Sequence, residues 1–462
     1  MKKLLIICQD HIGEKMAGPA IRSWEFATSL SKEYKVTVLS PNKSDKKSRD
    51  FKIRLNTRKA LKEEIIACEA LVSQKITPRI VQLAKKYNTR LILDAYDPIS
   101  IESLEANSHE SMSVRNNTNK ILLLEQSFSF VYADGVICAS EKQRDYWIGV
   151  LSGLNRITPN VYDKDNSIRD LIDVVPFGIS SKAPKKNKNK SVLRNKFNLE
   201  KDDFVLIWGG GIWNWFDPIS LIEAVAKTPK KLKVKLVFMG IDHPNKDIPR
   251  MPMVEKAIKK AKSLNVYNKS VFFNEGWVAY EERQEYLLDA NVGVSMHYDH
   301  LETRFSFRTR MLDYIWAGLP IIATKGDSFA ELIESNKMGV VVDYADSESI
   351  SNAISLLAEN NHLYNEASAN IQNIKSKYYW QVCVRPISRM IKNWEDTVLD
   401  DKPSTKIVLS RFAALYEARK LITKKAIKKY LSPVENKHRI VKAYTSQNVI
   451  RRKKVLRIFN KQ

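Results

Sequence analysis

The stretch that decides the fold runs from residue 306 to residue 334 and reads SFRTRMLDYIWAGLPIIATKGDSFAELIE. Apolar residues recur at helical spacing in its first part, and this predicts a helix. Gly318 and Pro320 follow directly and are typical of the end of a helix. The apolar residues after them predict a short buried strand, which a loop and a second helix follow. The stretch therefore has the pattern of an α/β unit.

Three arginines stand at or just before the start of the first helix. We expect Arg304, Arg308 and Arg310 to lie around its first turn, where backbone N–H groups have no partner within the helix. Such a helix start carries partial positive charge, and added guanidinium groups make it a candidate diphosphate site. The alternative is an ordinary α/β unit whose arginines are solvated.

These residues resemble the nucleotide-sugar segment of glycosyltransferase family four. In that family an acidic residue begins an Ala/Gly-rich helix, and a Gly-x-Pro turn, a strand and a loop ending in Glu follow. The corresponding residues here are Asp313, Tyr314, Ala317, Gly318, Leu319, Pro320 and Glu331. The resemblance extends to residues 271–276, 286–295 and 338–343. It implies a GT-B fold and a retaining, nucleotide-sugar-dependent enzyme of the bacterial polysaccharide or O-antigen type.

The length and the alternation of strand and helix patterns also predict two domains. A chain of 462 residues exceeds one usual domain, and repeated strand–helix alternation favours parallel sheets. The expected fold class is α/β, with two Rossmann-like, doubly wound domains facing a cleft. With the domain roles and the returning helix that the resemblance implies, we expect an acceptor-side domain at 1–180, a linker at 181–200, a nucleotide-sugar-binding domain at 201–375, a closing helix returning to the first domain at 376–400, and a basic tail at 401–462.

The local patterns predict individual elements. Strands are expected at 3–8, 35–39, 65–72, 90–94, 135–138, 173–175 and 204–208. Helices are expected at 20–32, 121–132, 141–151, 362–375 and 378–394.

The tail is strongly basic. The chain has a net charge of +24, and residues 401–462 contain 18 lysines and arginines against three acidic residues. Residues 404–431 predict a basic amphipathic helix, which suits an anionic membrane surface at about 1 kcal/mol per near-surface cation. A helix solvated on the body of the protein and a disordered tail are the alternatives. Few aromatic residues are present for base stacking, so nucleic acid is the poorer interpretation.

The cysteines and the N-terminus predict a cytoplasmic protein, peripheral on the inner face of the membrane if the tail binds it. Cys8, Cys68, Cys138 and Cys383 are far apart and form no CxxC pair. The apolar run in MKKLLIICQ is too short for a signal peptide and is better explained by a first strand. No stretch approaches 18 apolar residues.

Two glycine-containing loops are candidate ligand contacts. Gly18, Pro19 and Arg22 follow the first strand, where ligands bind in open α/β sheets, although a plain strand–helix turn is the alternative. The second loop carries Gly209, Gly210, Gly211, Trp213 and Asn214, whose backbone, aromatic and amide groups suit a nucleotide sugar. Nearby Asp217 is expected to cap the next helix, with hydrogen bonding to sugar hydroxyls as the alternative. The family often has an Arg and a Lys in this second loop. Neither is here, so Arg304, Arg308 and Arg310 are expected to replace them.

Several acids are candidates for hydrogen bonding to the donor. The resemblance implies that Asp313 and Glu331 contact the donor, but Phe305 stands at the position of the family's other acid, and Glu302 is the nearest substitute. The alternatives are a helix salt bridge for Asp313 and a surface role for Glu302. No His, Cys, Asp or Glu cluster has metal-ligand spacing, so neither metal nor cofactor is expected.

Asp94 and Asp97 follow a strand of the first domain and are the candidates to orient or deprotonate an acceptor hydroxyl, with turn formation as the alternative. Arg308 and Arg310 would stabilise the leaving diphosphate. The sequence thus predicts transfer of a sugar from a nucleotide-diphosphate sugar to an acceptor hydroxyl, on a lipid-linked saccharide. The alternatives are a nucleotide-sugar epimerase of the same fold and a non-catalytic basic protein that binds nucleic acid or membrane.

Overall fold

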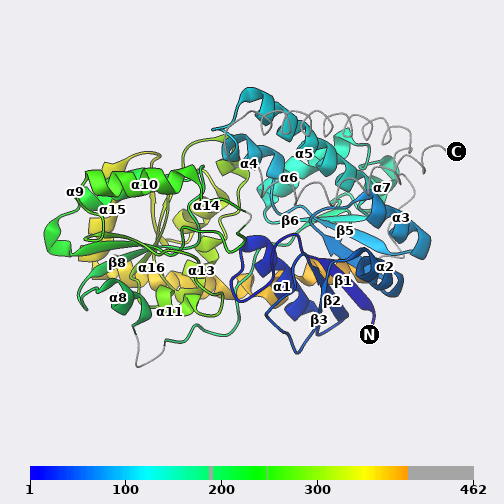
Figure 1. Ribbon diagram of the computed structural model, residues 1–462, viewed down its shortest axis with the longest axis horizontal. Helices are drawn as coiled ribbons and strands as arrows, with labels where there is room; N and C mark the ends of the chain where they lie inside the picture. Colours follow the sequence, from blue (N-terminus) through cyan, green and yellow to red (C-terminus); the bar gives the residue numbers. More distant parts are fainter. Residues whose placement is uncertain (187–190, 247, 394–462) are drawn as a thin grey trace, which may run out of the picture.

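The computed structural model describes residues 1–186, 191–246 and 248–393, which form two α/β domains side by side (Figure 1). Within these residues each domain is built on one parallel sheet. The first sheet has the strand order β3-β2-β1-β4-β5-β6-β7, and the second has the order β10-β9-β8-β11-β12-β13. In each sheet the order reverses beside the first strand of the domain, β1 or β8, which is where ligands bind in doubly wound folds.

The first domain alternates strands and helices along the chain. Its strands are β1 (Lys3–Ile7), β2 (Lys35–Ser40), β3 (Lys52–Leu55), β4 (Ala70–Ser73), β5 (Arg90–Asp94), β6 (Gly135–Cys138) and β7 (Ile172–Val174). Its helices are α1 (Gly18–Leu30), α2 (Arg58–Ala67), α3 (Pro78–Tyr87), α4 (Ile99–Ala106), α5 (Met112–Tyr132), α6 (Glu141–Gly153) and α7 (Pro159–Lys164).

The second domain repeats this plan. Its strands are β8 (Phe204–Trp208), β9 (Val234–Phe238), β10 (Val271–Phe273), β11 (Val292–Ser295), β12 (Ile321–Thr324) and β13 (Gly339–Val342). Its helices are α8 (Val192–Phe197), α9 (Pro218–Lys227), α10 (Pro252–Ser263), α11 (Arg283–Leu287), α12 (Leu301–Phe305), α13 (Arg310–Ala317), α14 (Ser328–Ser335), α15 (Ser347–Glu359) and α16 (Asn361–Ile374), with a 3-10 turn at Lys230–Leu232.

Local sequence explains where several of these helices begin and end. Asp217 caps α9 by accepting from the Ser220 N–H at 2.9 Å, as the sequence predicted. Gly318 ends α13 with a φ of 77°, a conformation that glycine adopts without strain. The four cysteines are buried and unpaired, as expected of core residues. No helix in the described part of the chain has the length and apolarity that a membrane crossing needs.

The structure corrects several element predictions. Residues 65–67 belong to α2 rather than to a strand, and the strand β4 begins only at Ala70. The strand β3 was missed because KIRL is half polar and lies at the sheet edge. The helix predicted at 121–132 begins nine residues earlier, at Met112. The predicted arginine-rich helix start is divided, since Arg304 lies in α12 and only Arg310 lies in the first turn of α13.

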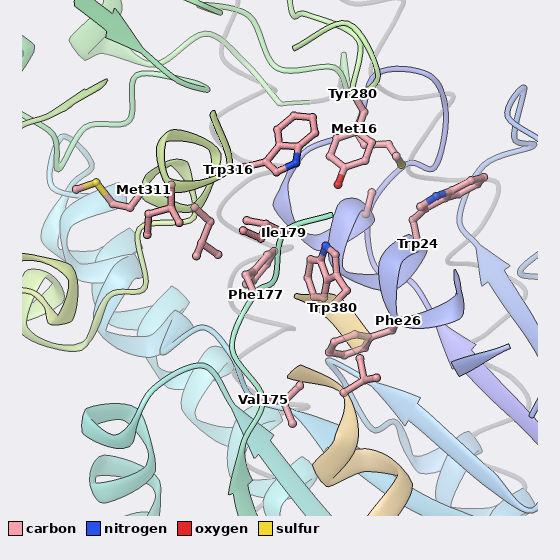
Figure 2. Packing of buried hydrophobic residues seen from close by; sticks show 14 of the residues in the cluster. Met16, Trp24, Phe26, Val175, Phe177, Ile179, Tyr280, Met311, Trp316 and Trp380 are labelled. Atoms are coloured by element: carbon pink, nitrogen blue, oxygen red, sulfur yellow. The ribbon is translucent and has the colours of Figure 1, made fainter. Parts of the chain in front are cut away.

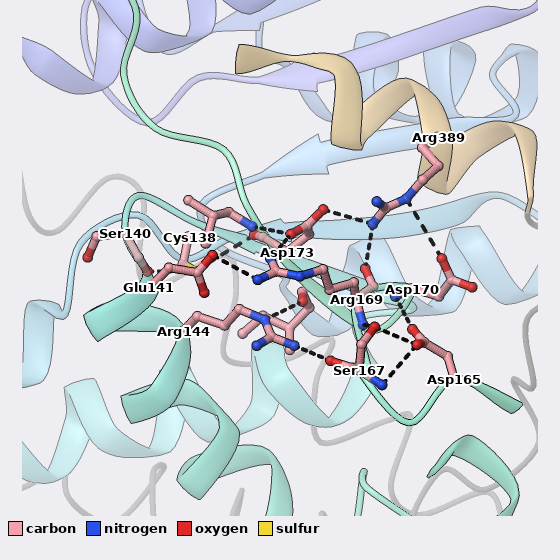
Figure 3. A network of polar contacts seen from close by, with 12 residues as sticks. Cys138, Ser140, Glu141, Arg144, Asp165, Ser167, Arg169, Asp170, Asp173 and Arg389 are labelled. Carbon is pink, nitrogen blue, oxygen red and sulfur yellow. Dashed lines mark hydrogen bonds and ion pairs between the residues drawn. The ribbon is translucent and has the colours of Figure 1, made fainter. Parts of the chain in front are cut away.

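The closing segment contacts the first domain and consists of three pieces. These are a 3-10 turn at Lys375–Tyr378, α17 (Trp380–Cys383) and α18 (Arg385–Lys392). Pro386 has no N–H to continue the preceding helix, which explains the break between α17 and α18. The Arg389 guanidinium of α18 donates to Asp173 at 2.8 Å, and Asp173 also accepts from Arg169 (Figure 3). The prediction for residues 394–400 and for the tail lies outside the described residues.

One apolar cluster joins the domains to both connections between them. It includes Met16 from the first domain, Ile179 from the connection that follows β7, Met311 from the second domain and Trp380 from the closing segment (Figure 2). The two connections are hydrogen-bonded to each other, because Ile179 donates to the Tyr378 carbonyl at 2.7 Å and accepts from the Trp380 N–H at 3.1 Å. The chain therefore passes between the two domains twice, and the two connecting segments lie side by side.

Candidate functional site

A cavity lies between the domains, among loops that follow the strands of both sheets. The first domain contributes Met16 to Gly18, after β1, and the second contributes Gly209 to Gly211, after β8. Gly240 follows β9, and Trp277 follows β10. The cavity contains about 980 Å³ of empty space, part of it open solvent. Its position is the one expected for a ligand in this class of fold.

The glycine run after β8 brings backbone to the cavity wall. The Gly209 N–H donates to the Tyr314 hydroxyl at 2.8 Å, and that hydroxyl donates to the Val294 carbonyl at 2.9 Å. Gly210 has a φ of +71°, and a Cβ on Gly211 would lie 3.2 Å from the Trp277 ring. The backbone conformation disfavours a side chain at position 210, and contact with the Trp277 ring disfavours one at position 211. A ligand here can therefore lie directly against the main chain.

Arg310 forms a buried positive wall of the same cavity. Its guanidinium donates to the Gly211 carbonyl at 2.9 Å and lies over the rings of Trp208 and Phe216, with distances of 4.4 and 4.2 Å to the ring centroids. Its Nη1 is buried and has no hydrogen-bond partner among the described residues. Burial lowers the pKa of Arg310 to about 10, so the group remains protonated at neutral pH. A buried cation with an unused donor suits an anionic ligand.

Arg283 and Asp313 form a second charged wall. The Arg283 Nε donates to an Asp313 carboxylate oxygen at 3.0 Å, and the guanidinium lies over the rings of Tyr280 and Trp316. Burial acts to lower the pKa of Arg283, but the negative potential of Tyr280 and Asp313 outweighs it and raises the pKa overall. Sequence reasoning missed Arg283, because the surrounding residues, EERQEY, look like an ordinary polar helix start.

The cavity brings together part of the predicted site. Seven of the predicted residues line it: Gly18, Gly209, Gly210, Gly211, Trp213, Arg310 and Asp313. Their roles in binding remain predictions. The two glycine loops belong to different domains and are almost 200 residues apart in the chain, so only the fold places them on the same cavity.

Arg22 and Asp94 instead form a buried ion pair. Two guanidinium nitrogens of Arg22 donate to the two carboxylate oxygens of Asp94, both at 2.8 Å, and one of them also donates to the Val175 carbonyl. Arg22 has an exposed fraction of 0%, so its charge is held inside the first domain rather than presented to a phosphate. Pro19 lies in the first turn of α1, and its carbonyl accepts from Ser23.

Asp97, Glu302 and Arg308 lie in a second polar cluster, where α4 meets α12. The Arg308 guanidinium donates to both carboxylate oxygens of Glu302, at 2.7 and 2.6 Å, and both side chains are buried. Asp97 is hydrogen-bonded to Glu102, and burial raises the pKa of both carboxyls. Repulsion between the two negative charges raises the pKa of Glu102 further. This pair therefore favours a state in which one carboxyl keeps its proton.

The remaining predicted residues lie outside the cavity. Arg304 is exposed on α12 with its guanidinium over the Phe305 ring. Asn214 accepts from the Met253 N–H at 3.2 Å, and the exposed Glu331 forms an ion pair with Lys142 of the first domain at 2.6 Å. Within residues 1–186, 191–246 and 248–393, no group of three His, Cys, Asp or Glu residues is arranged to hold a metal ion.

Phe305, which stands where the resembled family has an acid, helps to join the domains. Its carbonyl accepts from the Gln143 side chain at 2.9 Å, and its ring centroid lies 5.0 Å from that of Tyr146. Both partners belong to α6 of the first domain. This position therefore makes a contact between domains instead of offering a carboxylate.

Comparison with known proteins agrees with this geometry. Residues 189–374 match the family model described as "Glycosyl transferases group 1". No curated protein sequence matches the chain. Among solved structures, HepE from Anabaena in complex with UDP and glucose is similar with a TM-score of 0.61 and 14% identity, covering 85% of this chain and 100% of HepE.

Two further structures are similar over nearly the same extent. Sucrose-phosphate synthase from Thermosynechococcus elongatus has a TM-score of 0.59 and 15% identity, covering 86% of this chain and all of the other. WaaG, a glycosyltransferase involved in lipopolysaccharide biosynthesis, has a TM-score of 0.58 and 15% identity, covering 84% of this chain and 98% of WaaG. The fold is GT-B. The family match over the second domain indicates a glycosyltransferase.

Proposed function

We propose that the protein transfers a sugar from a nucleotide-diphosphate sugar to an acceptor hydroxyl, with retention of configuration and without a metal ion. The observation that carries the proposal is the meeting of Gly209–Gly211 with Arg310, Arg283 and Asp313 in one cavity between the domains. The HepE structure holds UDP and glucose on a similar fold, which supports a nucleotide-sugar donor.

The charged walls have complementary tasks in this proposal. Negative charge develops on the diphosphate as the bond to the sugar breaks. Arg310 stabilises this charge with its Nη1 N–H group, which has no hydrogen-bond partner among the described residues. Arg283 is the second cation of the cavity and takes the place of the basic residues that are missing from the glycine loop. Asp313 accepts hydrogen bonds from ribose or sugar hydroxyls. Closing of the cleft around the bound nucleotide sugar excludes water, which strengthens these interactions.

The acceptor side is assigned to the first domain. Of the two predicted acids, Asp94 has both oxygens engaged by Arg22, whereas Asp97 shares a polar cluster with Glu102 at the contact between the domains. We therefore propose Asp97 rather than Asp94 as the group that orients or deprotonates the acceptor hydroxyl. The basic sequence of residues 401–462 supports an acceptor carried on a lipid at the cytoplasmic face of a membrane.

A panel of nucleotide sugars tests the proposal. The melting temperature is measured with UDP-, GDP- and ADP-sugars, and a true donor raises it by mass action. The stabilising donor is then incubated with the protein alone and with lipid-linked saccharide acceptors. Conversion of the donor to an isomer without acceptor would identify an epimerase. Failure of every nucleotide sugar to stabilise the protein would contradict the proposal.

A further inference from the structure

Trp380 is a buried hydrogen-bond donor on the cavity wall that no described protein group satisfies. Its exposed fraction is 3%, and its side chain lines the cavity together with Gly178, Phe177 and Ile21. The indole Nε1 has no hydrogen-bond partner among residues 1–186, 191–246 and 248–393. Buried donors without partners are rare in native proteins because they lose their hydrogen bonds to water. This donor therefore requires an explanation.

The position of the indole is closely determined by its surroundings. The backbone of Trp380 donates to the Ile179 carbonyl at 3.1 Å. A Cβ on Gly178 would lie 2.7 Å from the Trp380 ring, so the absence of a side chain at Gly178 lets the ring lie against the connection that follows β7. Phe26 and Phe177 hold the other sides of the ring, each with a centroid distance of 5.9 Å. Rotation of the ring toward another partner would disturb this packing.

The nitrogen is directed toward the cavity side of this packing. In Figure 2 it points toward the region where Met16 and Tyr280 lie, and both of these residues line the cavity. Two other tryptophans near the site use their N–H groups within the protein: the half-buried Trp277 donates to the Met16 carbonyl, and the buried Trp316 donates to the Lys182 carbonyl. Trp380 thus resembles Arg310, which lines the same cavity from the second domain. The buried Nη1 of Arg310 likewise has no hydrogen-bond partner among the described residues.

We propose that the Trp380 indole N–H binds the donor by donating a hydrogen bond to one of its oxygens. This inference rests on the proposed function, which supplies a nucleotide-diphosphate sugar in the cavity. The oxygen acceptor belongs either to the diphosphate or to a hydroxyl of the transferred sugar or ribose, and an indole N–H, which only donates, suits both. Trp380 lies on one of the two connections between the domains. Through this bond the nucleotide sugar therefore contacts the segment that joins the domains.

The test removes the N–H while retaining an aromatic ring. Wild-type protein, Trp380→Phe and a variant with 3-benzothienylalanine at position 380, which keeps the ring size but lacks the N–H, are titrated calorimetrically. The probes are UDP-glucose, GDP-mannose and ADP-glucose, and the three corresponding nucleoside diphosphates. Trp147→Phe is the matched control, because the Trp147 N–H donates to the Ala95 carbonyl at 2.8 Å and does not line the cavity.

We expect both changes at position 380 to weaken binding of the preferred nucleotide sugar about five- to tenfold, the effect of one lost hydrogen bond, and the control to leave binding unchanged. If binding of the nucleoside diphosphate weakens equally, the contact is to the nucleoside diphosphate part of the nucleotide sugar. If only binding of the nucleotide sugar weakens, the contact is to the transferred sugar. If the wild type binds a nucleotide sugar and both position-380 variants bind it equally well, this inference is wrong, but the proposed function is not contradicted. Absence of wild-type binding to every probe overturns the proposed function as well.

Discussion

Arg308 and Arg310 are two residues apart in the chain, yet the structure gives them opposite surroundings. Arg308 lies in the polar cluster between α4 and α12, where both carboxylate oxygens of Glu302 accept its hydrogen bonds. Arg310 lies on the cavity wall, where it contacts a carbonyl and two aromatic rings and has an unused buried Nη1. The charge of Arg308 is already neutralised, whereas that of Arg310 has no carboxylate partner among the described residues.

The difference teaches that a cluster of arginines in a sequence is not one functional unit. A guanidinium held by a buried carboxylate chiefly maintains structure, since separating the pair leaves an uncompensated charge. A guanidinium beside bare backbone at a cavity can bind an anion. We therefore propose that Arg310 contacts the phosphate and that Arg308 has a structural role. The following predictions test this division.

The largest expected effect is on stability, in Arg308→Met. Loss of the guanidinium leaves Glu302 buried without its partner, and the free energy of unfolding should fall by about 3–5 kcal/mol. Urea denaturation measures this, and the double variant Arg308→Met/Glu302→Gln should recover much of the loss. Unchanged stability with strongly reduced donor turnover would show instead that Arg308 grips the phosphate.

Arg310→Met should affect catalysis more than stability. Methionine retains contact with Trp208 and Phe216 but removes the positive charge, so release of nucleoside diphosphate in the presence of acceptor should slow about 100- to 1000-fold. The free energy of unfolding should change much less than in Arg308→Met. The control is Arg304→Met, because Arg304 is exposed and does not line the cavity. Equal activity of the two variants would remove Arg310 from the site.

Glu102→Gln should change the pH dependence of stability. Burial and the neighbouring Asp97 raise the pKa of Glu102 in the folded protein. Glu102 therefore keeps its proton in the folded state at pH values above about 4, where the unfolded chain releases it. Wild-type stability should therefore fall as pH rises from about 4 toward the folded pKa, by about 1.4 kcal/mol for each unit between the two pKa values. Melting temperatures across pH 4–9 should decline less steeply in Glu102→Gln. Glu334→Gln, at an exposed site on α14, should follow the wild type.

The smallest effect is expected for Glu331→Gln. Glu331 is exposed and pairs with Lys142 at 2.6 Å, and exposed ion pairs contribute about 0–1 kcal/mol. Donor affinity, measured by calorimetry, should change less than twofold. A tenfold loss would restore Glu331 as a donor contact, as the resemblance implied.

The sequence predicted much of the fold because buried strands of parallel sheets leave a strong local pattern. The strands at 90–94, 135–138 and 204–208 have the predicted limits, since each is a short apolar run bounded by polar or turn residues. Boundaries were predicted poorly where apolar residues continue from one element into the next, as between α2 and β4. The half-polar edge strand β3 has no such pattern and was missed.

The sequence by itself determined the two α/β domains, the glycine loops after the strands and the caps at Asp217 and Gly318, because these depend on residues close together in the chain. Only the tertiary structure decided which charges are paired and which line the cavity. Arg22 meets Asp94 across 72 residues, and Arg310 meets Gly211 across 99. Partner choice at such separations depends on how the sheets and crossovers pack, and no local spacing encodes it.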